Sequence, residues 1–281
     1  MTLPILSSVR HLQTFPSRHV RYLAYGGRLE FLKEVQMKTI SKVLFGAACL
    51  AGTFATAADA QDWGGLTATV ALTSDYRFRG ITQNSKEATP SGGLTWNLPE
   101  GFYVSGWTSK TNWGGNNPSF EVDLYGGKHF DLGGTDLNIM AYYYAYPDYK
   151  GPVAASFYET IVQLTHAFGP LTITATGANS PEWSLGGGTA WYTSGLASYA
   201  VTDWLSLSGT VGHQWVDLAP SDYTHWDIGA TATYRSFALD VRYVGNDIGS
   251  GACTGYWMAT PKACQDGFVA TLTYTINPFG G

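Results

Sequence analysis

Charged side chains recur at every second position in several stretches of this 281-residue chain. The residues concerned are Asp75, Arg77, Arg79, Glu121, Asp123, Glu159, Asp227, Asp240 and Arg242. Residues two apart in a β-strand lie on the same face. We therefore expect these nine side chains on the polar face of a sheet. There, carboxylates and guanidinium groups either pair with one another or act together on charged ligands.

Groups suited to covalent or metal chemistry are sparse. His213 shares the parity of Leu207 and Val211, and a histidine beside a serine and an orienting polar group could hydrolyse a lipid ester. No serine has a compelling position beside His213, and the histidines lack metal-ligand spacing. The sequence therefore predicts neither a metal site nor a cofactor and favours a protein that is not an enzyme. A lipid-hydrolysing enzyme remains the weaker alternative.

The N-terminal residues have the features of a cleaved signal sequence. Residues 37–60 combine Lys38 and Lys42, a short apolar stretch and the small-residue site Ala58-Asp59-Ala60, which is the layout of a secretory signal peptide. Residues 1–36 precede this signal, and we interpret them as a dispensable extension or a misassigned start. Removing residues 1–60 leaves 9 Lys+Arg and 18 Asp+Glu, a net charge of −9. This acidic balance argues against a nucleic-acid partner.

Apolar and polar residues alternate throughout residues 61–281, which predicts β-strands with one apolar and one polar face. The first stretch, 66–79, is longer than most strands of soluble proteins and long enough to cross a bilayer. We predict twelve strands, at 66–79, 94–98, 102–109, 120–125, 137–144, 158–164, 171–176, 190–200, 205–214, 226–234, 237–243 and 268–276.

Short and long connections alternate between these strands. The short ones are 99–101, 131–134, 169–170, 201–202 and 235–236, and the long ones are 80–90, 110–119, 147–156, 177–189, 216–223 and 245–266. An even number of strands with short turns at one end is typical of bacterial outer-membrane barrels. We therefore predict an all-β, antiparallel transmembrane barrel with short periplasmic turns and long extracellular loops. A secreted lipocalin-like barrel would need outer faces rich in Lys and Glu, which these strands lack.

The chain also resembles a known family. Residues 71–83, ALTSDYRFRGITQ, resemble the opening strand of the TorF family of porin-like outer-membrane proteins. The stretch Gly101–Val104 with Trp107, the stretch Glu121–Gly127, and a paired-cysteine loop before the last strand are also similar to that family. The resemblance implies an outer-membrane location and a porin-like role, with the substrate undefined.

Cys253 and Cys264 are the only cysteines after residue 60, and an even pair in an exported chain predicts a disulfide.

Together the features of the sequence predict an outer-membrane channel through which small polar solutes or ions diffuse passively. Its selectivity would be set by the nine charged side chains of the lumen. Expected partners are outer-membrane lipid, lipopolysaccharide and the barrel-assembly machinery of a Gram-negative bacterium. A non-conducting structural or receptor barrel is the main alternative.

Overall fold

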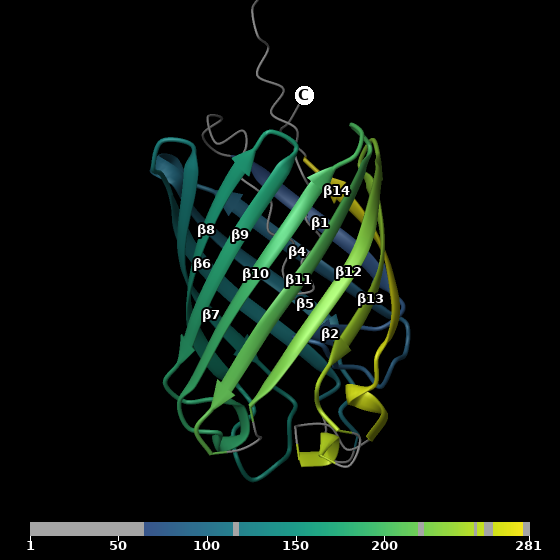
Figure 1. The fold of residues 1–281 in the computed structure, drawn as a ribbon. Coiled ribbons are helices and arrows are strands. Elements are labelled where there is room, and N and C mark those ends of the chain that lie inside the picture. Colours follow the sequence, from purple (N-terminus) through teal and green to yellow (C-terminus); the bar gives the residue numbers. More distant parts are fainter. Residues whose placement is uncertain (1–64, 115–117, 219–221, 250–251, 256–260, 278–281) are drawn as a thin grey trace, which may run out of the picture. The chain divides into compact units, whose positions relative to one another are not determined.

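Twelve antiparallel strands close into one barrel in the computed structural model, in which each strand pairs with its neighbour along the chain and β1 closes the ring against β14 (Figure 1). The structure describes residues 65–114, 118–218, 222–249, 252–255 and 261–277, so the expected leader lies outside the described residues. The barrel strands are β1 (Leu66–Thr73), β4 (Thr89–Asn97), β5 (Phe102–Lys110), β6 (Phe120–Asp131), β7 (Thr135–Ala145), β8 (Phe157–Phe168), β9 (Leu171–Ser180), β10 (Ala190–Ala200), β11 (Leu205–Val216), β12 (Tyr223–Tyr234), β13 (Phe237–Asn246) and β14 (Gly267–Ile276). This confirms the predicted fold class and strand number.

The alternation in the sequence separates an apolar outer wall from a polar interior. Val70, Leu72 and Ile228 point outward and are 52%, 54% and 67% exposed. Residues of the opposite parity, such as Thr69 and Asp227, point inward and are half-buried or buried. In a closed barrel every strand has two partners, so the backbone leaves no open edge. Among the described residues, no helix is both long enough and apolar enough to cross a membrane.

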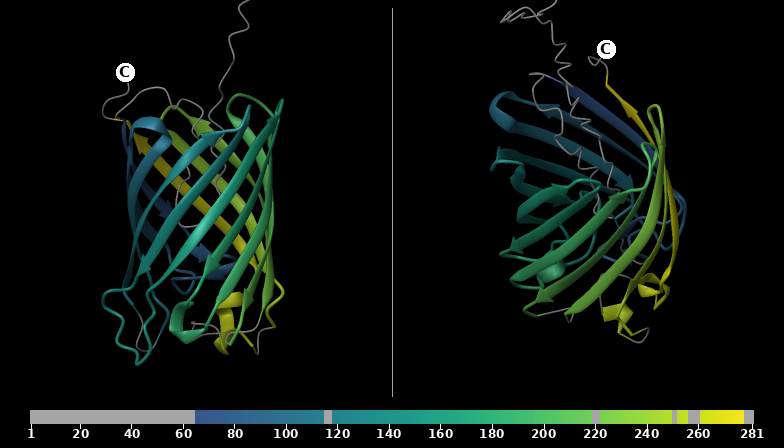
Figure 2. Two further views of the ribbon diagram at one scale, coloured as in Figure 1. Left: turned by 90° about the vertical axis from the view of Figure 1, so that its left-hand side faces the viewer. Right: turned by 45° about the horizontal axis from the view of Figure 1, so that its top comes forward.

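The two ends of the barrel differ, and the views in Figure 2 show compact turns at one end and larger loops at the other. The short-turn end carries the connections 98–101, 132–134, 169–170, 201–204 and 235–236. The long-loop end carries 74–88, 111–119, 146–156, 181–189, 217–222 and 247–266. The predicted alternation of connection lengths is confirmed, with boundaries shifted by a few residues.

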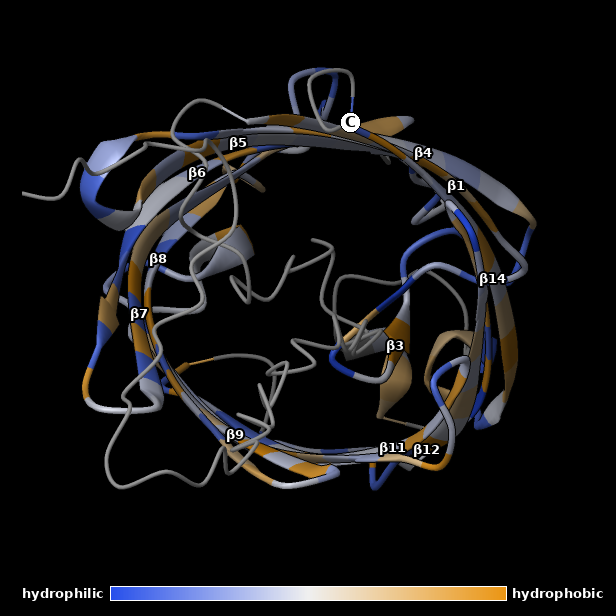
Figure 3. Ribbon diagram, turned by 90° about the horizontal axis from the view of Figure 1, so that it is seen from above, coloured by the Kyte–Doolittle hydropathy of each residue, from blue (hydrophilic) through white to orange (hydrophobic). Residues whose placement is uncertain are grey.

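The first predicted strand ends early. β1 stops at Thr73, and the next residues turn into the bore, where β2 (Arg77–Phe78) pairs with β3 (Ile81–Thr82) (Figure 3). The expectation of an uninterrupted strand over 66–79 was therefore wrong. Local hydrogen bonds compete with the strand ladder, because Asn84 accepts from the backbone N–H of Tyr76, and the Gln83 N–H donates to the Tyr76 carbonyl at 2.6 Å.

Two aromatic residues consequently lie on the opposite side from the one predicted. In the predicted strand over 66–79, Tyr76 and Phe78 share the outward parity of Val70 and Leu72, yet both are buried in the aromatic core inside the barrel. Trp96, Phe102 and Trp204 do lie on the outer wall and are exposed.

Candidate functional site in the barrel interior

The interior has two differently filled halves. Toward the short-turn end, threonines such as Thr172 and Thr273 line the wall and are half-buried. Toward the long-loop end, every residue from Asp75 to Asn84, here called the inserted segment, is buried. The inserted segment therefore occupies the bore where the strands meet the long loops, and the hydroxyl-lined half lies beyond it.

Arg79 joins the inserted segment to opposite parts of the wall. Its two terminal nitrogens donate to the Glu159 carboxylate of β8 at 3.0 and 2.8 Å. One of them also donates to the Gln214 side-chain oxygen of β11 at 2.5 Å. The guanidinium carbon lies 3.8 Å from the centre of the Tyr192 ring on β10, a cation–π contact. Bidentate geometry is the strongest arrangement for an arginine–carboxylate pair, so these contacts form the main anchor of the segment.

The other two arginines are paired as well. Arg77 Nε donates to Asp75 at 2.7 Å within the inserted segment. Arg242 lies between two carboxylates of the wall, with Nε 2.6 Å from Asp240 and Nη1 bonded to Asp227. Each guanidinium of the predicted set thus has a carboxylate partner.

Glu121 and Asp123 differ from the other predicted carboxylates. Both are fully buried on β6, and among the described residues no arginine or lysine lies within ion-pair distance of either. Tyrosine hydroxyls hold one oxygen of each: Tyr76 donates to Glu121 at 3.0 Å and Tyr142 donates to Asp123 at 2.9 Å. The remaining oxygens, Glu121 Oε1 and Asp123 Oδ1, have no hydrogen-bond partner. These two carboxylates are the uncompensated acids of the bore.

The structure thus places all nine predicted charged residues inside the barrel, but by two routes. Glu121, Asp123, Glu159, Asp227, Asp240 and Arg242 point inward because of strand parity, whereas Asp75, Arg77 and Arg79 enter with the inserted segment. Six carboxylates against three guanidinium groups give these nine residues a formal charge of −3. Their influence on ion selection stays a prediction.

A ladder of aromatic rings covers the wall behind the inserted segment. Tyr125, Tyr142, Tyr144, Phe157 and Trp183 follow one another with ring-centre distances of 4.5, 4.4, 4.4 and 4.6 Å. Parity indicates the inward direction of the two β7 tyrosines, Tyr142 and Tyr144. The roles of Gln214 and Tyr192 around Arg79 are not apparent from the sequence, because the Arg79–Gln214 contact joins residues 135 apart.

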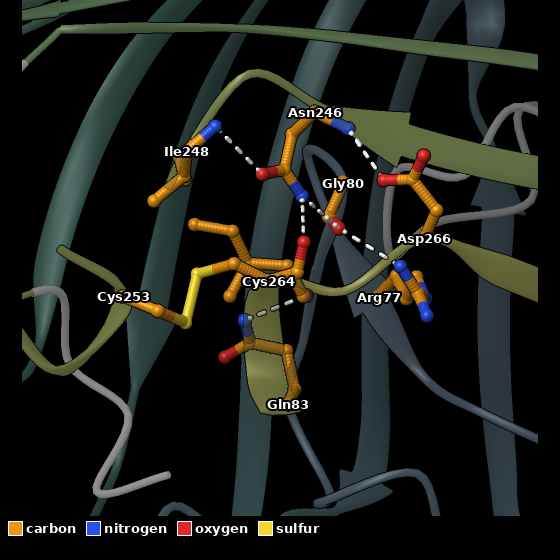
Figure 4. Close-up of a disulfide and its surroundings, with 9 residues drawn as sticks. Arg77, Gly80, Gln83, Asn246, Ile248, Cys253, Cys264 and Asp266 are labelled. Atoms are coloured by element: carbon orange, nitrogen blue, oxygen red, sulfur yellow. Dashed lines mark hydrogen bonds between the residues drawn. A yellow bond between two sulfur atoms is a disulfide. The ribbon is translucent and has the colours of Figure 1, made fainter. Parts of the chain in front are cut away.

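The predicted disulfide between Cys253 and Cys264 is present, with the two Cα atoms 5.7 Å apart (Figure 4). Asn246, the last residue of β13, connects this disulfide to the inserted segment. Its side-chain amide nitrogen donates to the Gly80 carbonyl at 3.2 Å and to the Cys264 carbonyl at 2.9 Å. Cys264 and the inserted segment are therefore held together at the long-loop end.

The long loops include Lys86 and Asp148, whose pKa values are both lowered. Burial lowers the pKa of the Lys86 ammonium, and the neighbouring Arg77 charge lowers this pKa further. Partial burial raises the pKa of Asp148, but hydrogen bonds from the side chain and backbone of Ser119 outweigh it, so the net pKa is lowered. Asp148 therefore stays ionised and ties the 146–156 loop to the 111–119 loop.

The interior shows no arrangement for metal chemistry: across the described ranges, no group of three or more His, Cys, Asp or Glu residues is placed to hold a metal ion. His213 lies on the outer side of β11. Its Nδ1 is 2.9 Å from the Thr224 hydroxyl, and its ring packs against Trp215. This is a hydrogen-bonded, aromatic environment at the rim of the barrel.

A family described as a bacterial protein of unknown function (Gcw_chp) matches residues 57–276. The chain belongs to this family. Its Gcw_chp region contains the whole barrel, from β1 to β14, including the inserted segment and the disulfide. No curated protein matches the sequence significantly.

Solved structures share the fold of this Gcw_chp chain. The NanC porin superposes with a TM-score of 0.51 at 8% identity, covering 76% of this chain and all of the other. The KdgM porin superposes with a TM-score of 0.50 at 5% identity, covering 76% of this chain and 99% of the other. These similarities show that the twelve-stranded barrel is the fold found in outer-membrane porins. They agree with the barrel fold that the TorF resemblance implied, and they do not show the TorF assignment itself.

Proposed function

We propose that this protein is a porin-like channel of the outer membrane through which small polar solutes diffuse passively. The observation that carries the proposal is the inverted polarity of the barrel. Apolar side chains such as Leu72 and Ile228 are exposed outside, whereas charged and hydroxyl side chains line the inside. Exposed apolar surface on this scale is stable only against lipid, and a barrel has no unpaired edge within the membrane.

Several features support the orientation and location. Exposed Trp96, Phe102, Trp204 and Trp215 near strand ends suit the membrane–water boundaries. Short turns would face the periplasm and long loops the exterior, in contact with lipopolysaccharide. Delivery would depend on the signal peptide at 37–60 and on the barrel-assembly machinery. The TorF resemblance of residues 71–83 fits the same assignment.

The charge of the bore suggests which solutes pass. The three arginines are paired with carboxylates, while Glu121 and Asp123 have no cationic partner in the part of the chain that the structure describes. A net negative interior attracts cations and repels anions, and a low-dielectric wall strengthens the effect. The proposed channel therefore prefers cations and neutral polar solutes.

Solute flux into vesicles tests the function directly. Liposomes that contain the refolded protein should swell in an isosmotic solution of a small sugar and swell less in a larger oligosaccharide. Protein-free liposomes and liposomes with heat-unfolded protein provide the background rates. Swelling equal to these backgrounds for every solute would instead favour the non-conducting structural or receptor barrel, for which the buried inserted segment is the specific argument.

A further inference from the structure

The groups that accept hydrogen bonds from Arg79 are also held by hydrogen bonds to the barrel wall. Tyr144 donates its hydroxyl to Glu159 at 3.1 Å and so orients the carboxylate. The Gln214 amide nitrogen donates to the carbonyls of Trp191 at 3.0 Å and Trp215 at 3.1 Å, so its oxygen is directed into the bore. Because strands hold both acceptors through these bonds, the site is preorganised for a donor that arrives from the lumen.

The chemistry of this site matches a planar cation. The Glu159 carboxylate accepts two parallel hydrogen bonds, the Gln214 oxygen accepts a third, and the Tyr192 ring offers its face. Trp183 lies 5.6 Å from the same cation. A bidentate carboxylate with a stacked ring recognises guanidinium better than a compact ammonium ion, since only the planar fork satisfies both contacts.

Arg79 belongs to the inserted segment, which has exposed residues at both ends and a second contact with the wall at Gly80. Ser74, Glu87 and Ala88, which flank the inserted segment, are exposed to solvent. Gly80 has a φ of +86°. A Cβ added there would lie 2.8 Å from the His225 Cβ, so the backbone of this turn contacts the wall directly. The segment thus enters the bore, presents one guanidinium to the site and returns.

We propose that the inserted segment is a releasable plug and that Arg79 is the internal ligand of a guanidinium-binding site formed by Glu159, Gln214 and Tyr192. This inference rests on the proposed channel function and deepens it. Solutes that carry a guanidinium group compete with Arg79 for the site. When the segment leaves, Glu159 requires a replacement cation, because an unpaired buried carboxylate is unfavourable.

Chemical rescue tests the site. Arg79→Ala removes the internal ligand, so its single-channel conductance should rise severalfold over that of the unsubstituted protein. Millimolar guanidinium chloride should return the current of this variant toward the original value. Urea, which is planar and of similar size but neutral, should have no such effect at equal ionic strength. Adding Glu159→Gln to Arg79→Ala should abolish the rescue.

A matched control separates the site from general charge effects. Lys110 pairs with Glu87 at 3.5 Å near the same end of the barrel, but both side chains are about half exposed. Lys110→Ala should leave the conductance unchanged. An Arg79→Ala conductance equal to that of the unsubstituted protein, or equal rescue by urea and guanidinium, would overturn the proposal.

A deletion keeps the test usable if Arg79→Ala fails to fold. Thr73 pairs directly with Thr89, so removing residues 76–83 leaves a loop that can still close the β1–β4 hairpin. Guanidinium should block current through this deletion variant, and the block should vanish with Glu159→Gln. A block that survives Glu159→Gln would overturn the site.

If the unsubstituted and deletion proteins are both silent, the channel function itself fails. If both conduct equally, the channel function stands and the plug is refuted.

Discussion

Removal of the Arg242 guanidinium should destabilise the barrel strongly. Arg242, Asp227 and Asp240 have side chains that are only 1%, 3% and 7% exposed. Their nitrogen–oxygen distances are 2.5 to 2.8 Å. All three lie on the wall strands β12 and β13, so the paired backbone of the barrel holds the guanidinium and the two carboxylates together. Arg242→Gln would leave two buried carboxylates without their guanidinium.

The expected cost follows from this geometry. Breaking a buried ion pair by removing one partner costs about 3–5 kcal/mol. Since 1.4 kcal/mol is a factor of about ten, the folding equilibrium constant should fall by roughly two to three and a half orders of magnitude. The free energy of unfolding can be measured by urea titration in phospholipid vesicles, followed by tryptophan fluorescence.

A companion variant identifies the origin of the loss. Combining Arg242→Gln with Asp227→Asn and Asp240→Asn removes the unpaired charges and should recover most of the lost free energy of unfolding. If Arg242→Gln alone costs less than about 1 kcal/mol, as exposed pairs do, the buried-network interpretation is wrong. A triple variant as unstable as the single one would also refute it, because loss of packing rather than unpaired charge would then be responsible.

Three further predictions concern other parts of the barrel. Glu121→Gln with Asp123→Asn should shift the reversal potential in a KCl gradient toward weaker cation preference, because the negative charge carried by this carboxyl pair is removed. Cys253→Ser with Cys264→Ser should lower the free energy of unfolding by about 3 kcal/mol in the chain-entropy model, measured by urea titration. Ile228→Arg, on the outer wall at mid-strand and 67% exposed, should cost about 2–4 kcal/mol of stability in vesicles.

Each of these has a contradicting result. An unchanged reversal potential in the acid-pair variant would show that these carboxylates do not act on the ion path. Equal stability of the protein with and without the cysteines would mean that the loop is already constrained by its contacts. A neutral effect of Ile228→Arg in vesicles would indicate that this face meets water rather than lipid.

Local sequence pattern was sufficient to predict the strands. Alternation of residues such as Leu205, Ser206 and Leu207 depends only on neighbours in the chain, because a shift of one residue would move every apolar side chain to the other face. The connection lengths followed from the same reading. Both features are local, so the sequence carries them directly.

The inserted segment was not predictable in the same way. Asp75, Arg77 and Arg79 continue the alternation of β1, and nothing nearby marks the end of the strand at Thr73. The alternative conformation is stabilised by distant partners: Arg79 meets Glu159 80 residues away, and Tyr76 meets Glu121 45 residues away. A reading based on neighbouring residues could find the inward charges but not their pairing.

Electrical recording from the refolded, unsubstituted protein in a planar bilayer shows whether the barrel conducts. Discrete current steps are expected, with a reversal potential that favours cations because the nine lumen residues carry a formal charge of −3. A bilayer that stays silent at every applied voltage, although the protein is folded and inserted, would contradict the proposed channel function.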